Sequence, residues 1–174
     1  ATFPDLRGFF VQEEAADSDG EIRAGFNSNP DDGKFRMLYK ADGERNFKTV
    51  YNEADETWVG SVPTPELFIP GTDMAYTISN HDGVDKVYKM NMKTMEIVET
   101  AFETEGFDVQ GIIPSKDDSK LVGVRTFDGT MRLVWTNENL KTVQTILDET
   151  FGQDKATIVD WSNDFMTQVI YVGG

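Results

Sequence analysis

The repeat that decides the fold is clearest in residues 67–108, LFIPGTDMAYTISNHDGVDKVYKMNMKTMEIVETAFETEGFD. Short runs alternate between apolar and polar residues, as where Tyr88 and Met90 alternate with Lys89 and Asn91. An alternation with a period of two is typical of strands that bury one face. Asp82-Gly83 and the Lys93-Thr94 region lie between such runs, so the stretch predicts consecutive antiparallel strands joined by tight turns.

The same pattern occurs on both sides of this stretch. Further strands are predicted at 35–39, 121–124 and 132–135, where apolar or β-branched residues dominate. Asp-Gly pairs at 42–43, 82–83 and 128–129 lie between strand-like runs and are 40 and 46 residues apart. Asp-Gly favours hairpin turns because Gly adopts positive φ freely and Asp tolerates it.

A second marker recurs at nearly the same spacing. Ile69-Pro70-Gly71-Thr72-Asp73, Ile113-Pro114-Ser115-Lys116-Asp117 and Trp161-Ser162-Asn163-Asp164 each precede a predicted strand. From Pro70 to Pro114 is 44 residues, and from there to Ser162 is 48. An all-strand repeat of 40 to 50 residues is typical of β-propeller blades, and an ordinary β-sandwich is the alternative. We favour the propeller because two markers share one period.

The length of 174 residues corresponds to roughly four blades of this size. We interpret residues 1–174 as a single propeller segment, with an irregular acidic part at 1–34 and blade repeats at 35–174. Strands are predicted at Gly8–Gln12 and Glu21–Phe26 within the acidic part. The last repeat stops after one strand, so we expect a segment of a propeller of about seven or eight blades. A closed ring of four blades is the alternative.

An open arc would leave unpaired strand edges and uncovered apolar faces at its ends. We therefore expect the isolated segment to associate with itself, unless its ends close on each other.

One stretch departs from the strand pattern. Leu140, Val143, Ile146, Leu147 and Phe151 recur at helical spacing and share one face. Asn137 or Asn139 could cap the start, and Gly152 follows the end. A helix inserted between strands is predicted over about residues 139–150.

Composition excludes several classes of function. The net charge is −15, from 16 basic and 31 acidic residues, which disfavours binding to nucleic acid or an anionic membrane. No apolar run approaches the ~20 residues of a membrane span, and no secretory signal pattern is present. The absence of Cys removes disulfides and thiol catalysis, and a single His excludes a multi-histidine metal site. Both the cytoplasm and the periplasm remain open as compartments.

Several polar residues are candidates for a functional site. Asp17-Ser18-Asp19-Gly20-Glu21-Ile22 is similar to a calcium loop, but Ala15 and Phe26 stand where two ligands would be required, which favours an acidic hairpin turn. His81 precedes Asp82-Gly83 and is interpreted as a turn residue rather than a general base.

Carboxylates and tryptophans are the remaining candidates. Paired carboxylates could perform glycoside chemistry, although a solvated loop surface is the preferred interpretation for Glu53, Asp55, Glu56, Glu103, Glu105, Asp117 and Asp118. Trp58, Trp135 and Trp161 could stack on sugars, but packing between blades is favoured because each lies in or beside a strand. We predict no catalytic residue, cofactor or metal ligand in this chain.

The order of motifs resembles that of a known family. The motifs are Leu38-Tyr39-Lys40, Phe47-Lys48-Thr49-Val50-Tyr51, Asp55-Glu56-Thr57-Trp58, the segment from Ser79 to Tyr88, Lys120-Leu121-Val122-Gly123-Val124, and the segment from Ile158 to Asp164. Between residues 21 and 172 this order resembles the N-terminal β-propeller of the prolyl oligopeptidase family of serine peptidases. The bacterial dipeptidyl- and acyl-aminoacyl-peptidase-like members are the most similar.

This resemblance implies a division of labour within a larger peptidase. An α/β-hydrolase domain of the parent chain would carry the Ser-His-Asp triad, and the propeller would admit only short or unfolded peptides. The hydrolase motif G-x-S-x-G is absent here, because no Gly is followed by Ser two residues later. The parent would be a serine peptidase and this segment its non-catalytic gate.

Two other classes compete with this interpretation. A stand-alone propeller, similar to TolB-type or WD-repeat scaffolds, would bind another protein. A propeller enzyme that hydrolyses sugars or lactones would use carboxylates and a calcium ion at the tunnel mouth.

Overall fold

The computed structural model describes residues 13–28, 33–53 and 58–173. Within these residues the chain consists of antiparallel strands and one helix, which confirms the predicted all-β class. Two compact units, Ala1–Gly106 and Phe107–Gly174, follow each other along the chain. No helix in the described part is long and apolar enough to cross a membrane.

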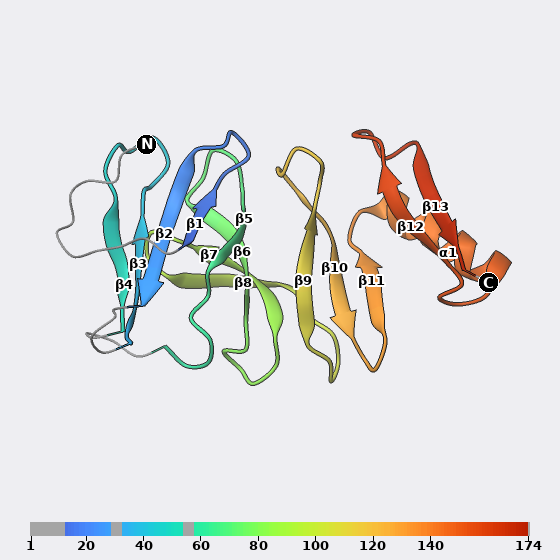
Figure 1. Cartoon of the computed structure of the whole chain (residues 1–174), viewed down its shortest axis with the longest axis horizontal. Coiled ribbons are helices and arrows are strands. Elements are labelled where there is room, and N and C mark those ends of the chain that lie inside the picture. The colour runs from blue at the N-terminus through green and yellow to red at the C-terminus, as the bar shows by residue number, and fades with distance from the viewer. Residues whose placement is uncertain (1–12, 29–32, 54–57, 174) are drawn as a thin grey trace. The chain divides into compact units, whose positions relative to one another are not determined.

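The first unit contains two four-stranded sheets (Figure 1). One is formed in chain order by β1 (Glu13–Ala16), β2 (Ile22–Ser28), β3 (Phe35–Tyr39) and β4 (Lys48–Asn52). The other is formed by β5 (Pro65–Phe68), β6 (Met74–Ser79), β7 (Lys86–Asn91) and β8 (Glu96–Phe102). Each strand pairs with its neighbour in sequence, so both sheets are meanders.

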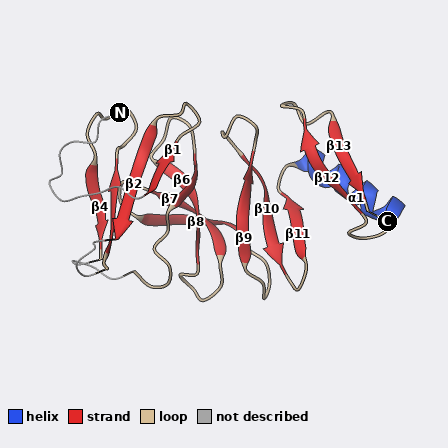
Figure 2. Cartoon of the chain, viewed as in Figure 1, coloured by secondary structure: helices blue, strands red, loops and turns tan. Residues whose placement is uncertain are grey.

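The second unit contains smaller sheets and the helix (Figure 2). A three-stranded sheet is formed by β9 (Val109–Pro114), β10 (Leu121–Phe127) and β11 (Met131–Trp135). Helix α1 (Glu138–Phe151) follows, and β12 (Ala156–Trp161) then pairs with β13 (Gln168–Val172).

The helix begins and ends where the sequence predicts. The Asn137 side chain accepts hydrogen bonds from the backbone amides of Asn139 and Leu140, and Gly152 follows with a positive φ. Leu140 is fully buried, whereas Ile146 and Phe151 are about half exposed, at 55% and 49%. The apolar face of the helix is therefore narrower than the sequence spacing predicts.

The first and second strands of successive sheets are joined by related turns. The backbone amides of Ile69, Ser115 and Ser162 each donate to the carbonyl five residues later, at 2.9, 2.8 and 2.8 Å. In the turns at Ser115 and Ser162, the Ser hydroxyl donates a hydrogen bond to the carboxylate of the Asp two residues later. The same hydroxyl accepts a hydrogen bond from the backbone amide five residues later. The Ser115 and Ser119 hydroxyls lower the pKa of Asp117 to about 2, so its carboxylate stays ionised and holds the turn.

The acidic part before residue 34 contributes two strands, β1 and β2, to the first sheet. The turn at Asp17 is related but one residue shorter, because the Asp17 amide donates to the carbonyl of Glu21, four residues later. As in the turns at Ser115 and Ser162, the amide three residues later donates to the carbonyl of the first turn residue. The Asp17 carboxylate accepts the amides of Asp19 and Glu21, and Gly20 adopts positive φ. An acidic hairpin turn is therefore confirmed between β1 and β2, with a register shift at Ala15 and Ala16. The strand predicted at Gly8–Gln12 lies outside the described residues.

One Asp-Gly pair occupies a different position from the one that the spacing suggested. Asp82-Gly83 and Asp128-Gly129 join the second and third strands of their sheets, whereas Asp42-Gly43 joins the third and fourth. The corresponding glycine of the first sheet is Gly33, which adopts positive φ between β2 and β3.

The two sheets of the first unit share one hydrophobic core. Met37 and Tyr39 of β3 belong to the same buried cluster as Phe68, Ala75 and Met90 of the other sheet. Tyr39 and Phe68 stack with their ring centroids 6.2 Å apart. The second unit has its own cluster, in which Trp135 and Leu140 pack with Ile113, Val122 and Ile158.

A buried arginine links the two sheets of the first unit through hydrogen bonds and ion pairs. Arg23 of β2 is 2% exposed, and its Nε donates to the Lys40 carbonyl at 2.9 Å. Its Nη2 donates to the Tyr39 hydroxyl at 2.7 Å and to the Thr72 carbonyl, in the β5–β6 turn, at 3.2 Å. The carboxylates around it belong to Asp17, Asp42 and Asp73, at 3.3, 3.3 and 3.4 Å.

Replacing this arginine by the shorter, unbranched apolar side chain of methionine should destabilise the first unit. Arg23→Met leaves the carboxylates and the carbonyl groups without their donor, so the free energy of unfolding should fall by about 3–5 kcal/mol. Lys89→Met is the control, since Lys89 pairs with Glu99 at the surface and its loss should cost less than about 1 kcal/mol. Urea unfolding measures both, and equal losses would contradict the role of Arg23.

Two glycines of the three-stranded sheet differ in the space around them. A Cβ atom at Gly123 would lie 2.9 Å from the Trp135 ring and 3.0 Å from the Val134 carbonyl, so Gly123→Ala should destabilise the chain by about 1–3 kcal/mol. At Gly111 the nearest atom would be 3.6 Å away, so Gly111→Ala should be neutral or slightly stabilising. Thermal unfolding followed by near-ultraviolet circular dichroism compares them, and a tolerated Gly123→Ala would contradict the packing.

Candidate functional site

A cavity of about 510 Å³ lies in the first unit beside the outer strands of its two sheets. Its lining consists of Glu13, Glu14, Ala15 and Ala16 of β1, Phe26 of β2, and Thr64, Pro65 and Glu66 at the start of β5. Strands β1 and β5 are each the first strand of their sheet and pair on one side only among the described residues. The cavity is therefore framed by two sheet edges.

The local sequence explains why these edges do not join into one sheet. Pro65 opens β5 and has no amide hydrogen to donate, which confines it to an edge position. β1 carries the adjacent carboxylates Glu13 and Glu14, and charged side chains of this kind discourage further strand pairing. The two strands consequently form no backbone ladder with each other.

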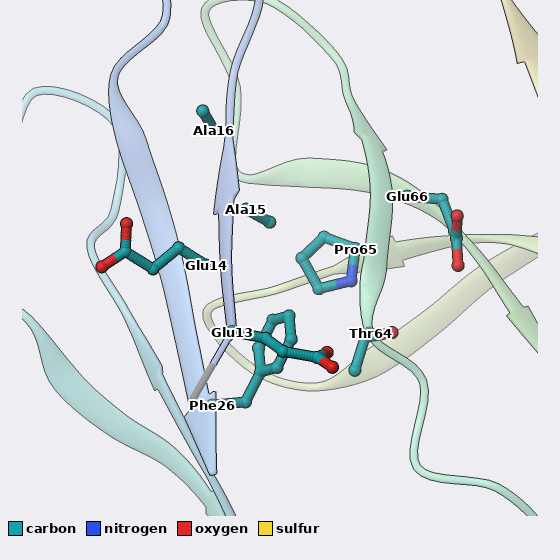
Figure 3. A pocket seen from close by; sticks show the side chains of 8 residues that line it. All are labelled: Glu13, Glu14, Ala15, Ala16, Phe26, Thr64, Pro65 and Glu66. Atoms are coloured by element: carbon teal, nitrogen blue, oxygen red, sulfur yellow. The ribbon is translucent and has the colours of Figure 1, made fainter. Parts of the chain in front are cut away.

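The side chains that line the cavity point in different directions (Figure 3). Figure 3 shows the Glu13 carboxylate directed toward Thr64, and the Pro65 ring facing β1. Glu14 extends to the opposite side of β1, and Glu66 lies on the side of β5 away from β1. Phe26 supplies an aromatic ring behind Glu13.

The lining that the structure describes is acidic and contains no Lys or Arg. With low-dielectric walls on two sides, such carboxylates create a negative potential that attracts cationic groups. Thr64 is the single hydroxyl of the described lining, which contains no His, Ser or Lys. The arrangement suits binding of a positively charged group.

The residues proposed from sequence lie elsewhere and have structural partners. His81 lies in the β6–β7 turn, with its Nδ1 atom 3.3 Å from the Val59 carbonyl and its ring 5.5 Å from that of Trp58. This placement agrees with its interpretation as a turn residue. It does not line the cavity.

The described carboxylates among the candidates for glycoside chemistry lie in different turns and have separate partners. Glu53 accepts the amide of Phe35 at 2.7 Å, and Glu103 pairs with Lys86 at 2.7 Å. Asp117 is held by two serine hydroxyls, and Asp118 adopts positive φ in the same turn. Glu105 is exposed, and Asp55 and Glu56 lie outside the described residues.

The tryptophans belong to the cores, as predicted. Trp58 packs against the cluster of the first unit. Trp135 is 5% exposed and meets Trp161 edge to face at 5.4 Å. No group of three or more acidic, His or Cys residues that could hold a metal ion occurs in the described part of the chain.

The cavity was not predicted from the sequence, although a signal for it exists. The turn Asp17-Ser18-Asp19-Gly20 marks the end of one strand and the start of the next, which places Glu13 and Glu14 on a strand. Their meeting with Thr64 and Pro65 depends on packing between two sheets, and no local pattern indicates it. Comparison with known proteins finds no matching protein-family model, curated protein or solved structure.

Proposed function

We propose that this chain is the non-catalytic propeller segment of a prolyl oligopeptidase-like serine peptidase and restricts which peptides reach the catalytic domain. The observation that carries the proposal is the related turn that opens four successive antiparallel sheets, at Asp17, Ile69, Ser115 and Ser162. A recurring supersecondary unit of about this length is what a propeller requires.

The cavity supplies a means of selecting peptides. In a propeller the blades surround a central channel, and in this proposal β1 and β5 face that channel. Glu13 then presents its carboxylate to entering peptides, and Glu14 and Glu66 add negative charge on the far sides of the two strands. A peptide with a free amino terminus carries a positive charge at its end, so the carboxylates attract and orient it.

The chemistry belongs to another domain in this proposal. Peptide hydrolysis by this class needs a serine on a strained strand–helix turn, with a histidine and an acid in support. No G-x-S-x-G motif exists in these 174 residues, and the single His serves a turn. This chain therefore contributes exclusion by size and attraction by charge.

The purified chain should hydrolyse neither peptides nor esters. The physical reason is the absence of a nucleophile elbow, which leaves no activated serine to attack a carbonyl. Fluorogenic dipeptide and ester substrates, together with a serine-reactive fluorophosphonate, measure this directly. Turnover that survives purification, with labelling of this chain, would refute the proposal.

The cavity should bind short peptides through their amino termini. A tripeptide with a free amino terminus, titrated into isotopically labelled protein, should perturb the amide signals of Ala15, Ala16 and Glu66, and its N-acetylated form should not. Glu13→Gln should weaken binding about two- to fivefold, in the range of one exposed ion pair. Glu96→Gln, on the exposed part of β8, is the control and should leave binding unchanged.

The coding sequence around this chain separates the competing classes. A G-x-S-x-G element within a few hundred residues downstream supports the peptidase. Its absence, combined with peptide binding at the cavity, would favour a stand-alone interaction propeller. No binding at the cavity would remove the gating role even if the hydrolase motif is present.

A further inference from the structure

A second, smaller cavity of about 200 Å³ lies in the first unit, beside the turns that join the third and fourth strands of its two sheets. We call it the lysine-rimmed cavity, and the one between β1 and β5 the acidic cavity. The two share no described lining residue. The lysine-rimmed cavity is lined by Tyr39 of β3, Lys48, Thr49 and Val50 of β4, Ala41 and Glu44 between these strands, and Lys93 between β7 and β8.

The inner wall of the lysine-rimmed cavity is apolar. Tyr39 and Ala41 are 2% and 5% exposed and belong to the core cluster of the first unit, and Val50 packs against that cluster. The Tyr39 hydroxyl is already engaged, since it accepts from Arg23 and donates to Asp73. An apolar cavity of roughly 150 Å³ holds one benzene ring, so this volume admits one ring or one short branched chain.

The rim of this cavity carries two exposed ammonium groups. The side chains of Lys48 and Lys93 are 63% and 49% exposed, and their Nζ atoms donate to the Glu44 carboxylate at 2.6 and 3.2 Å. These hydrogen bonds lower the pKa of Glu44, so the carboxylate stays ionised at neutral pH. An ammonium group has three N–H donors, and Glu44 uses one from each lysine. Further donors therefore remain for a second acceptor.

We infer that the lysine-rimmed cavity binds a small organic monocarboxylate that carries one ring or one short branched apolar group. The apolar group lies against Tyr39, Ala41 and Val50, and the ligand carboxylate accepts hydrogen bonds from Lys48 and Lys93. Two ammonium groups and one carboxylate leave one positive charge at the rim, which a monocarboxylate neutralises. The chain has a net charge of −15, so an anion is attracted only where lysines gather in this way.

This inference does not depend on the proposed peptidase function. It concerns a different cavity and a ligand of opposite charge to the amino terminus that the acidic cavity attracts. A ligand of about ten non-hydrogen atoms at an exposed rim should bind with a dissociation constant of about 1 mM. Added salt should weaken the binding, because screening reduces the attraction between the lysines and the carboxylate.

Titration of phenylacetate into the isotopically labelled chain, followed by nuclear magnetic resonance, tests the inference. The amide signals of Ala41, Val50 and Lys93 should shift with increasing phenylacetate. Phenylacetamide has the same ring without the charge, and acetate has the charge without the ring. Each should bind at least about fivefold more weakly than phenylacetate, because each loses one of the two kinds of contact.

Four variants separate the roles of the rim. Lys48→Gln and Lys93→Gln should each weaken phenylacetate binding about two- to fivefold, in the range of one exposed ion pair. Lys89→Gln is the matched control: it removes the same charge from β7, where Lys89 pairs with Glu99, and should change the affinity by less than about 1.5-fold. Glu44→Gln should strengthen binding about two- to fivefold, because it removes a carboxylate that repels the ligand. Circular dichroism verifies that the variants fold.

Several outcomes would overturn the inference. Equal affinity for phenylacetamide and phenylacetate would show that the lysines do not recognise the carboxylate. Shifts confined to Ala15 and Ala16 would place the ligand in the acidic cavity. A loss in Lys89→Gln as large as in Lys48→Gln would reduce the effect to net charge, and weaker binding in Glu44→Gln would contradict the repulsion.

Discussion

The first unit depends on a single buried guanidinium. Taking a charged group out of water is costly unless hydrogen bonds and opposite charges replace the solvent, and Arg23 obtains both. Its planar fork reaches the Tyr39 hydroxyl of its own sheet and the Thr72 carbonyl of the next sheet at the same time. A lysine ammonium is a compact point charge and has no such fork. The β5–β6 turn is held where Asp73 also accepts from the Tyr39 hydroxyl and the Asp42 amide.

The recurring turn imposes the second constraint, because it determines where each sheet begins. At the equivalent position the turns place Gly20, Asp118 and Phe165 at positive φ. Asp tolerates this backbone region, but a phenylalanine there is strained by of order 1–3 kcal/mol. Phe165 packs against the core of the second unit, and this burial offsets the strain. A residue with low turn propensity can therefore occupy the turn without changing its hydrogen bonds.

Most of the strands and the helix could be predicted because their signals are local. Alternation in Lys86–Asn91, the Asn137 cap and Gly152 each act within a few residues. Arg23 could not be predicted, since its partners Thr72 and Asp73 are 49 and 50 residues away and its aspartates look like ordinary surface residues in an acidic chain. The assignment of Asp42-Gly43 to the repeat was wrong although its signal is local. The pair correctly marks a turn, but the local sequence does not indicate which two strands of the sheet that turn joins.

The distribution of charge connects the remaining features. Many of the cations are already engaged, since Lys86 bridges Asp82 and Glu103, Lys116 pairs with Asp160, and Arg132 contacts both Asp128 and Asp154. The surplus carboxylates therefore make the local electrostatic potential negative where no Lys or Arg lies nearby, as around the described lining of the acidic cavity. The strands β9 and β13 contain no charged residue. Salt should weaken the binding of a cationic group at the acidic cavity, because screening reduces its attraction to the carboxylates.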